Sequence, residues 1–150
     1  MKHLGSNFAL ILTTAWVGGL WAIGYLAAPV LFNHTEDKQF AGMLAGHLFS
    51  WIAYVGLLSS LYLLVYFSMQ FGFGIFKQAI FWVVMLMLLL TLAGEFGIQP
   101  VIAELKMQAL PADVMHSLFA DRFKTWHGLA SIAYLAESLL GIILILKIKR

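Results

Sequence analysis

The sequence contains no cysteine and very few charged residues. Without cysteine, the chain has no disulfide bonds, no thiolate metal sites and no thiol catalysis. Only 11% of its residues are charged, whereas an ordinary soluble domain carries about 25%. The net charge of +2 gives no reason to expect a nucleic acid as a partner. HExxH, CxxC and glycine-rich phosphate-loop motifs are absent as well, so no sequence motif supports a metal site.

Four long apolar runs take the place of the missing charge. The first three contain no charged side chain, and the fourth contains only Glu137; they cover residues 8–32, 48–76, 78–94 and 125–146. A helix needs about 20 mostly apolar residues to cross the hydrocarbon core of a bilayer. The runs therefore predict an all-α membrane protein, a four-helix transmembrane bundle that forms one polytopic domain over residues 1–150. We expect the transmembrane helices at about residues 4–32, 48–68, 76–99 and 126–146.

The connections between these helices are expected to be partly helical. Residues 36–47 form an amphipathic pattern, which predicts a helix at the outer interface of the membrane that runs into the second transmembrane helix. Pro100 lacks a backbone N–H and is predicted to end the third helix. Beyond Pro100, apolar residues at helical spacing predict short helical pieces in the loop before the fourth helix.

Lysine and arginine are distributed unevenly between the two sides of the predicted membrane. With four crossings, both termini and the loop near Lys77 lie on one side, whose loops contain basic residues and no acid. The other side holds residues 33–47 and 98–125, in which basic and acidic residues are mixed. The positive-inside rule therefore predicts that both termini are cytoplasmic. We expect the bacterial inner membrane as the location.

Small residues in the first and fourth helices predict where helices meet. Thr14, Gly18 and Ala22 recur every four residues in the first helix, and Gly141 lies among small residues in the fourth. Such rows allow two helix backbones to approach closely within lipid. The row on the first helix also predicts a contact with a second copy of the chain, in a homo-oligomer, or with a partner in a membrane complex.

Ionisable side chains at membrane depth are costly, and each suggests a functional site. His47, Glu95 and His127 are predicted to lie at a similar depth in the outer half of the bundle. Gln99 lies one turn above Glu95, and His116 is placed in a loop that can fold over the group. These positions predict a polar cluster near the outer surface.

The chemistry of this cluster has two interpretations. Two imidazoles and a carboxylate suit a transition metal, and two imidazoles on facing helices can hold the iron of a haem b. In the other interpretation the histidines are simply solvated at helix ends and the protein has no cofactor. Glu95 then forms an ion pair with one of three basic residues: Lys124, Arg122 or His127.

Glu137 lies deeper, roughly 15 Å below His127 along the same helix and thus near the midplane. It shares a helix face with small residues, so it is predicted to face protein and not lipid. Glu137 is either a protonated hydrogen-bond donor or a participant in proton or cation movement. Ser131 and Tyr134 belong to the adjoining polar stripe, which is expected to face the interior. The predicted hydrogen-bond partners of Glu137 are Thr13, Thr14, Ser59 and Ser60.

Several segments resemble the transmembrane-protein-205-like family. They are residues 16–21 (WVGGLW), 28–32 (APVLF), 99–100 (QP) and 123–131 (FKTWHGLAS). The resemblance spans essentially the whole chain and implies the same four-helix order, with His127 and Ser131 in its most specific element. It implies no established activity for bacterial members. The human member is associated with platinum-drug resistance and membrane traffic, which points toward transport or metal handling.

The first helix and residues 31–34 (LFNH) are also similar, more distantly, to copper-resistance-D-like proteins and to HemJ-type protoporphyrinogen oxidases, which bind haem. Those oxidases carry a histidine within helix 1 and a basic residue beside the Leu-Phe element. This chain has Asn7 and Val30 near such positions.

Together these observations predict a non-enzymatic integral membrane protein that binds or transports a small ligand or cation. The expected ligand pathway comprises Glu95, Gln99, Ser131, Tyr134 and Glu137. A first alternative is a b-type haem oxidoreductase that acts on a porphyrin or a quinone. A second alternative is a structural or assembly subunit of a membrane complex.

Overall fold

The computed structural model describes residues 2–110 and 112–148 of the chain. Helices make up four long segments, which short turns connect. In chain order the segments are α1–η1–α2, α3–η2, α4–η3–α5 and α6, and η4 lies in the last connection. The bounds are α1 Lys2–Ala22, η1 Ile23–Ala27, α2 Ala28–His34, α3 Lys38–Phe71, η2 Gly72–Lys77, α4 Ala79–Leu92, η3 Ala93–Ile98, α5 Gln99–Ala109, η4 Val114–His116 and α6 Ala120–Ile148.

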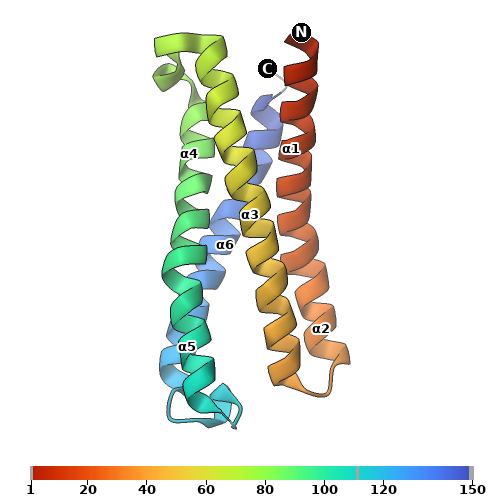
Figure 1. Ribbon diagram of the computed structural model, residues 1–150, viewed down its shortest axis with the longest axis vertical. Coiled ribbons are helices and arrows are strands. Elements are labelled where there is room, and N and C mark those ends of the chain that lie inside the picture. Colours follow the sequence, from red (N-terminus) through yellow and green to blue (C-terminus); the bar gives the residue numbers. More distant parts are fainter. Residues whose placement is uncertain (1, 111, 149–150) are drawn as a thin grey trace.

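The four segments run up and down in one bundle (Figure 1). Helix α1 contacts α3 and α6, and α4 contacts the same two helices from the other side, so the order around the bundle is α1, α3, α4, α6. Helix α1 begins, and α6 ends, at the end of the bundle that also holds η2 (Figure 1). We call this half the terminal half. The opposite half, which includes η1, α2, η3, α5 and η4, is called the loop half.

Each of the four segments is long and apolar enough to cross a membrane. Large apolar side chains such as Trp51, Leu58 and Ile132 are exposed on the surface. An apolar outer surface is what lipid requires of a membrane-spanning helix. The structure thus confirms the predicted four-helix transmembrane bundle.

Two prolines directly follow π-helical turns. Pro29 lies just beyond η1, and Pro100 lies just beyond η3. In η1 and η3 the backbone forms the wider hydrogen-bonded turns of a π-helix. A proline ring clashes with the carbonyl group four residues earlier in an ordinary α-helix, and the wider π turn relieves this conflict. The prediction that Pro100 ends the third transmembrane helix is therefore wrong, because α5 continues that segment to Ala109.

Residues 38–47 form the first turns of α3, so this segment runs into the second long helix as predicted. Its position at the outer interface of the membrane stays a prediction. Asp37 caps α3, because its carboxylate accepts hydrogen bonds from two backbone N–H groups of the first turn at 2.9 and 3.0 Å. Phe40 and Met43, which belong to the apolar stripe that suggested an interfacial helix, are exposed. The small residues on the other side of these turns are buried: Ala41, Gly42 and Ala45. In a membrane bundle, small residues favour contact with protein, while the larger apolar face points toward lipid.

The terminal half of the bundle is closely packed. One cluster of buried apolar side chains occupies it, formed by residues of α1, α3, η2, α4 and α6. Trp16 of α1 is fully buried and lies against Gly56 of α3, and Val17 lies against Gly141 of α6. A Cβ atom added at Gly56 would lie only 2.4 Å from Trp16 Nε1. A larger residue at position 56 would therefore collide with the Trp16 side chain, so glycine is required there.

Among the residues predicted to pack helices together, Gly141 lies inside the bundle. Thr14, Gly18 and Ala22 are exposed on α1. A Cβ atom added at Gly18 would have no neighbouring atom within 4 Å. This row is open to lipid or to a second copy of the chain, and its role as a contact between copies stays a prediction. Within the bundle, the adjacent Gly19 contacts Ile52 instead.

Candidate functional site

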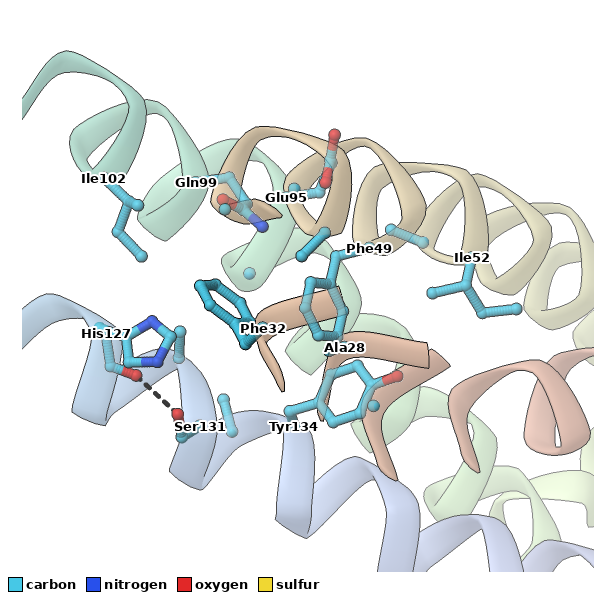
Figure 2. Close-up of a pocket in the computed structure, with 18 of the residues that line it drawn as sticks. Ala28, Phe32, Phe49, Ile52, Glu95, Gln99, Ile102, His127, Ser131 and Tyr134 are labelled. Atoms are coloured by element: carbon cyan, nitrogen blue, oxygen red, sulfur yellow. Dashed lines mark hydrogen bonds between the residues drawn. The ribbon is translucent and has the colours of Figure 1, made fainter. Parts of the chain in front are cut away.

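The loop half of the bundle contains a cavity of about 830 Å³. Its walls are mostly apolar, with Ala28, Phe32, Phe49 and Ile102 among the residues that form them (Figure 2). Protein interiors have few voids larger than a water molecule. Small-molecule sites, in contrast, have volumes of roughly 300–1,000 Å³, apolar walls and a few placed polar groups. The volume and the composition of this cavity lie within that range.

Six of the residues predicted for the polar cluster or the ligand pathway line this cavity: Glu95, Gln99, His127, Ser131, Tyr134 and Glu137. They come from two neighbouring segments, η3–α5 and α6. Figure 2 shows the Gln99 amide and the His127 ring directed toward Phe32. The structure therefore places these polar groups along one apolar space.

His47 and His116 do not belong to the cavity lining, and both side chains are exposed. Within residues 2–110 and 112–148, no three histidine, aspartate or glutamate side chains come together to hold a metal ion. The predicted metal cluster of His47, Glu95 and His127 is therefore not formed. His47 and His127 also do not flank a common cavity as axial haem ligands would. His47 lies one helical turn after the exposed Met43, on the outward face of α3, so a similar depth was not enough to bring the groups together.

Glu137 is buried, with 5% of its surface exposed, and its hydrogen-bond partner is Thr91 of α4. Thr91 Oγ1 lies 2.8 Å from Glu137 Oε1 and 2.9 Å from the carbonyl oxygen of Met87. A hydroxyl group has one proton and can donate to only one of these oxygens. Both contacts are satisfied when Thr91 donates to Met87 and a protonated Glu137 donates to Thr91. The geometry therefore favours a protonated carboxyl group, which also avoids the cost of a buried charge.

None of the four hydroxyl groups predicted as partners of Glu137 forms a hydrogen bond with it among the described residues. Thr14, Ser59 and Ser60 donate hydrogen bonds to backbone carbonyl groups. Thr13 is buried and has no hydrogen-bond partner among the described residues. The prediction that one of these four hydroxyl groups binds Glu137 is wrong, because its partner is Thr91. Thr91 lies one helical turn before Glu95 and was not among the predicted residues.

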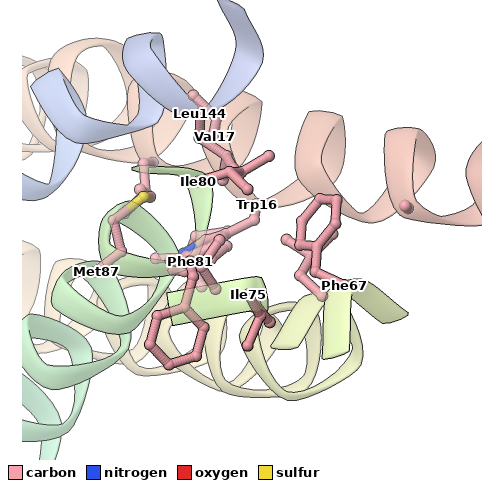
Figure 3. Packing of buried hydrophobic residues seen from close by; sticks show 13 residues of the cluster. Trp16, Val17, Phe67, Ile75, Ile80, Phe81, Met87 and Leu144 are labelled. Atoms are coloured by element: carbon pink, nitrogen blue, oxygen red, sulfur yellow. The ribbon is translucent and has the colours of Figure 1, made fainter. Parts of the chain in front are cut away.

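Glu137 lies where the cavity meets the packed terminal half. Trp16, which Figure 3 shows within the buried apolar cluster, and Ser138, which follows Glu137, are also buried. The Trp16 indole N–H and the Ser138 hydroxyl group have no hydrogen-bond partner in the described part of the chain. A thin layer of buried polar groups thus separates the open half of the bundle from the closed half.

Glu95 is half-buried, and its side-chain contact in the described part of the chain is a hydrogen bond. Ser50 of α3 donates to Glu95 Oε2 at 3.1 Å. The ion pair found in the described residues joins Lys124 and Asp121 at 3.8 Å on the exposed side of α6. The ion pairs predicted for Glu95 are not formed: those with Lys124, Arg122 and His127.

Helix α6 forms one wall of the cavity through three residues of its polar stripe. The Tyr134 hydroxyl donates to the carbonyl oxygen of Leu20 at 2.7 Å, which ties α6 to α1. The Tyr134 ring meets the Phe49 ring edge to face at 5.1 Å. Ser131 donates to the carbonyl oxygen of His127 within α6 at 2.8 Å (Figure 2). The His127 ring is therefore the group of this wall that is best placed to hydrogen-bond a molecule in the cavity.

Two cavity residues, Thr91 and Lys106, escaped the sequence analysis. The Lys106 Nζ atom reaches from α5 to α3 and donates to the carbonyl oxygen of Gly42 at 3.2 Å. A signal for both residues is present in the sequence. Together with Glu95 and Gln99 they recur at helical spacing along the third segment, and all four line the cavity. This stripe is visible only when the helix is allowed to continue past Pro100.

A family model for a domain of unknown function, DUF4149, matches residues 11–111. The chain belongs to this family. The matched region of this DUF4149 protein contains the α1, α3 and η3–α5 walls of the cavity and ends before α6. No curated protein and no solved structure matches the chain. The resemblances to the transmembrane-protein-205-like family and to the copper-resistance-D-like and HemJ-type proteins stay predictions.

Proposed function

We propose that the protein binds a small amphipathic organic molecule in the cavity of the loop half. The observation that carries this proposal is a space of about 830 Å³ with mostly apolar walls and a few separate polar groups. Such a space suits a molecule with a large apolar part. Gln99 and His127 offer hydrogen bonds to its polar part (Figure 2).

An organic ligand fits this cavity better than a bare cation. A cation site needs several oxygen or imidazole ligands that converge on one point, and no three histidine, aspartate or glutamate side chains of the described residues do so. Glu137, the expected internal partner of a moving cation, is already paired with Thr91. Its arrangement supports a structural role for the protonated carboxyl group.

We also propose that the loop half faces the outside of the cell, which makes the cavity accessible from that side. The support is the distribution of lysine and arginine along the sequence. Because the chain has no cysteine, single cysteines introduced at two almost fully exposed positions can report the orientation. Leu118 is 99% exposed near the loop end, and Phe73 is 97% exposed in η2. A membrane-impermeant maleimide should label Leu118→Cys in intact cells and Phe73→Cys only after permeabilisation, and the reverse pattern would contradict this orientation.

Two glycines of the same π-helical segment provide a test of ligand binding. Gly94 lines the cavity, whereas Gly97 is exposed and does not. A Cβ atom added at either glycine has no neighbour within 4 Å. Leucine at Gly94 therefore occupies space inside the cavity, and leucine at Gly97 adds the same volume outside it. The two variants share the same local backbone, so Gly97→Leu is the matched control.

The probe is oleyl alcohol, added to the purified full chain in phosphatidylcholine nanodiscs and detected by native mass spectrometry. We expect the wild-type protein and Gly97→Leu to bind it equally. Gly94→Leu should bind it about tenfold more weakly, because even one lost buried side-chain contact of about 1.4 kcal/mol has this effect. Equal binding by Gly94→Leu and Gly97→Leu would contradict the proposed function.

A further inference from the structure

Lys106 is a charged residue of the cavity wall that the protein leaves largely without partners. Its side chain is half-buried, and its ammonium group donates to the carbonyl oxygen of Gly42 at 3.2 Å. The same group lies 5.9 Å from the centre of the Phe123 ring. An ammonium group has three donors, and no carboxylate of the described residues lies within 4 Å of this one. A half-buried cation with a single carbonyl partner is expensive.

The other charged or acidic groups of the cavity wall already have partners. Lys38 donates to the carbonyl oxygens of Phe32 and Thr35 at 2.6 and 3.0 Å, and so caps the end of α2. Asp113 accepts a hydrogen bond from a backbone N–H of η4 at 3.0 Å. Glu95 and Glu137 accept or share hydrogen bonds with Ser50 and Thr91, respectively. Lys106 is therefore the cation of this wall with the most free hydrogen-bond donors, since Lys38 makes two hydrogen bonds and Lys106 makes one in the described part of the chain.

The space next to Lys106 continues along the apolar wall toward Thr91. Both residues line the same cavity, and they lie on one segment that α4, η3 and α5 form. At 1.5 Å per residue their positions are about 22 Å apart along this segment, which is the scale of a long acyl chain. Ile102 lies between them on this segment, and Phe32 of α2 and Phe49 of α3 line the same cavity.

We propose that the ligand is a single-chain amphiphile with an anionic head group, which binds Lys106, and an apolar tail that extends along the cavity toward Glu137. This inference rests on the proposed function and specifies the chemistry of its ligand. The head group is a carboxylate or a phosphate, both of which accept several charge-assisted hydrogen bonds from an ammonium group. The His127 ring, which lines the same cavity, is a second donor for it.

The test compares three ligands with the same tail: oleate, oleyl phosphate and oleyl alcohol. Lys106→Gln removes the charge inside the cavity, and Lys124→Gln is the matched control, because Lys124 is exposed and paired with Asp121. Binding is measured by native mass spectrometry of the full chain in phosphatidylcholine nanodiscs. We expect the wild-type protein to bind at least one of the two anions about tenfold or more tightly than the alcohol, since a hydrogen bond to a charged group has this magnitude. Which anion binds tighter identifies the head group.

Lys106→Gln should abolish this preference by weakening anion binding about tenfold or more, while Lys106→Arg and Lys124→Gln should retain the preference. A circular dichroism spectrum equal to that of the wild-type protein shows that Lys106→Gln still folds. Equal binding of anions and alcohol to the wild-type protein would overturn the inference, as would an equal loss of anion binding in Lys124→Gln. In both cases, weaker binding of the alcohol to the Gly94→Leu variant than to the Gly97→Leu variant would still support the proposed function. If Gly94→Leu weakens the binding of none of the three ligands, the proposed function itself fails.

Discussion

The two halves of the bundle use the same four segments in opposite ways. In the terminal half, each glycine at a helix crossing receives a side chain from the facing helix, as Gly56 receives Trp16 and Gly141 receives Val17. In the loop half, Gly24 contacts the Tyr134 ring, but Gly46 and Gly94 face open space. A small residue in a membrane helix therefore does not by itself indicate close packing. The residue opposite decides whether the glycine closes a helix contact or widens a cavity.

Backbone irregularity follows the same division. Both π-helical turns, η1 and η3, lie in the loop half, each just before a proline. The terminal halves of α1, α3, α4 and α6 are regular α-helices. Widened helical turns are frequent at functional sites. The half that contains the π-helical turns is thus the half in which a ligand site is expected.

The largest expected difference between the halves concerns two phenylalanines of α3. Phe67 belongs to the buried cluster, and Phe49 lines the cavity. They are 18 residues apart, which is about five helical turns, so both lie on the same face of the helix. We expect Phe67→Ala to lower the free energy of unfolding by about 3–5 kcal/mol. Phe49→Ala should cost less than half as much, because part of its ring already faces an open space.

Unfolding of the purified variants in mixed micelles with increasing fractions of sodium dodecyl sulfate, followed by circular dichroism, measures both costs. Equal losses for Phe67→Ala and Phe49→Ala would mean that the loop half is as closely packed as the terminal half. The cavity would then not exist in the membrane protein.

A smaller difference is expected for two glycines of α3. A Cβ atom at Gly56 would lie 2.4 Å from Trp16 Nε1, whereas one at Gly46 would have no neighbour within 4 Å. Gly56→Ala should therefore destabilise the protein by about 1–3 kcal/mol through overpacking. Gly46→Ala should stabilise it by up to about 1 kcal/mol, because alanine favours the helix. The same unfolding assay checks both signs, and a stabilising Gly56→Ala would contradict the close crossing of Trp16.

The smallest effect is expected at the boundary between the halves. Glu137→Gln keeps a hydrogen-bond donor next to Thr91 Oγ1 and has nearly the same shape as a protonated glutamate, so it should change the free energy of unfolding by less than about 1 kcal/mol. Infrared spectroscopy at neutral pH should show a protonated carboxyl band that Glu137→Gln removes. The control Glu104→Gln alters an exposed carboxylate, which accepts a hydrogen bond from Gln108, and should keep the band. A wild-type spectrum without the band would show that Glu137 is ionised.

The sequence predicted the four spans and the inward position of Glu137 for simple physical reasons. Long apolar runs have few alternatives to a spanning helix. A lone carboxyl group among small residues must face protein. The burial of Glu137 confirms this second prediction.

The remaining features depended on the residues that face each element, which a single sequence does not reveal. Pro100 was expected to end a helix, but a π-helical turn accommodates it, and so the stripe that includes Lys106 was missed. Similar depth suggested that His47 and His127 meet, but depth does not fix the direction of a side chain around its helix. His47 lies on the outward face of α3, because the small residues of these turns occupy the inward face.

An experimental density map of the protein in a lipid nanodisc is the most direct test of whether the loop half is open and the terminal half is closed. We expect elongated non-protein density that lies between Phe32, Gln99 and His127 and has one end at the Lys106 ammonium group. The packed cluster around Trp16 should appear without such density. A map in which α2 and α5 have closed on each other, with Phe32 filling the space between them, would contradict the existence of the cavity.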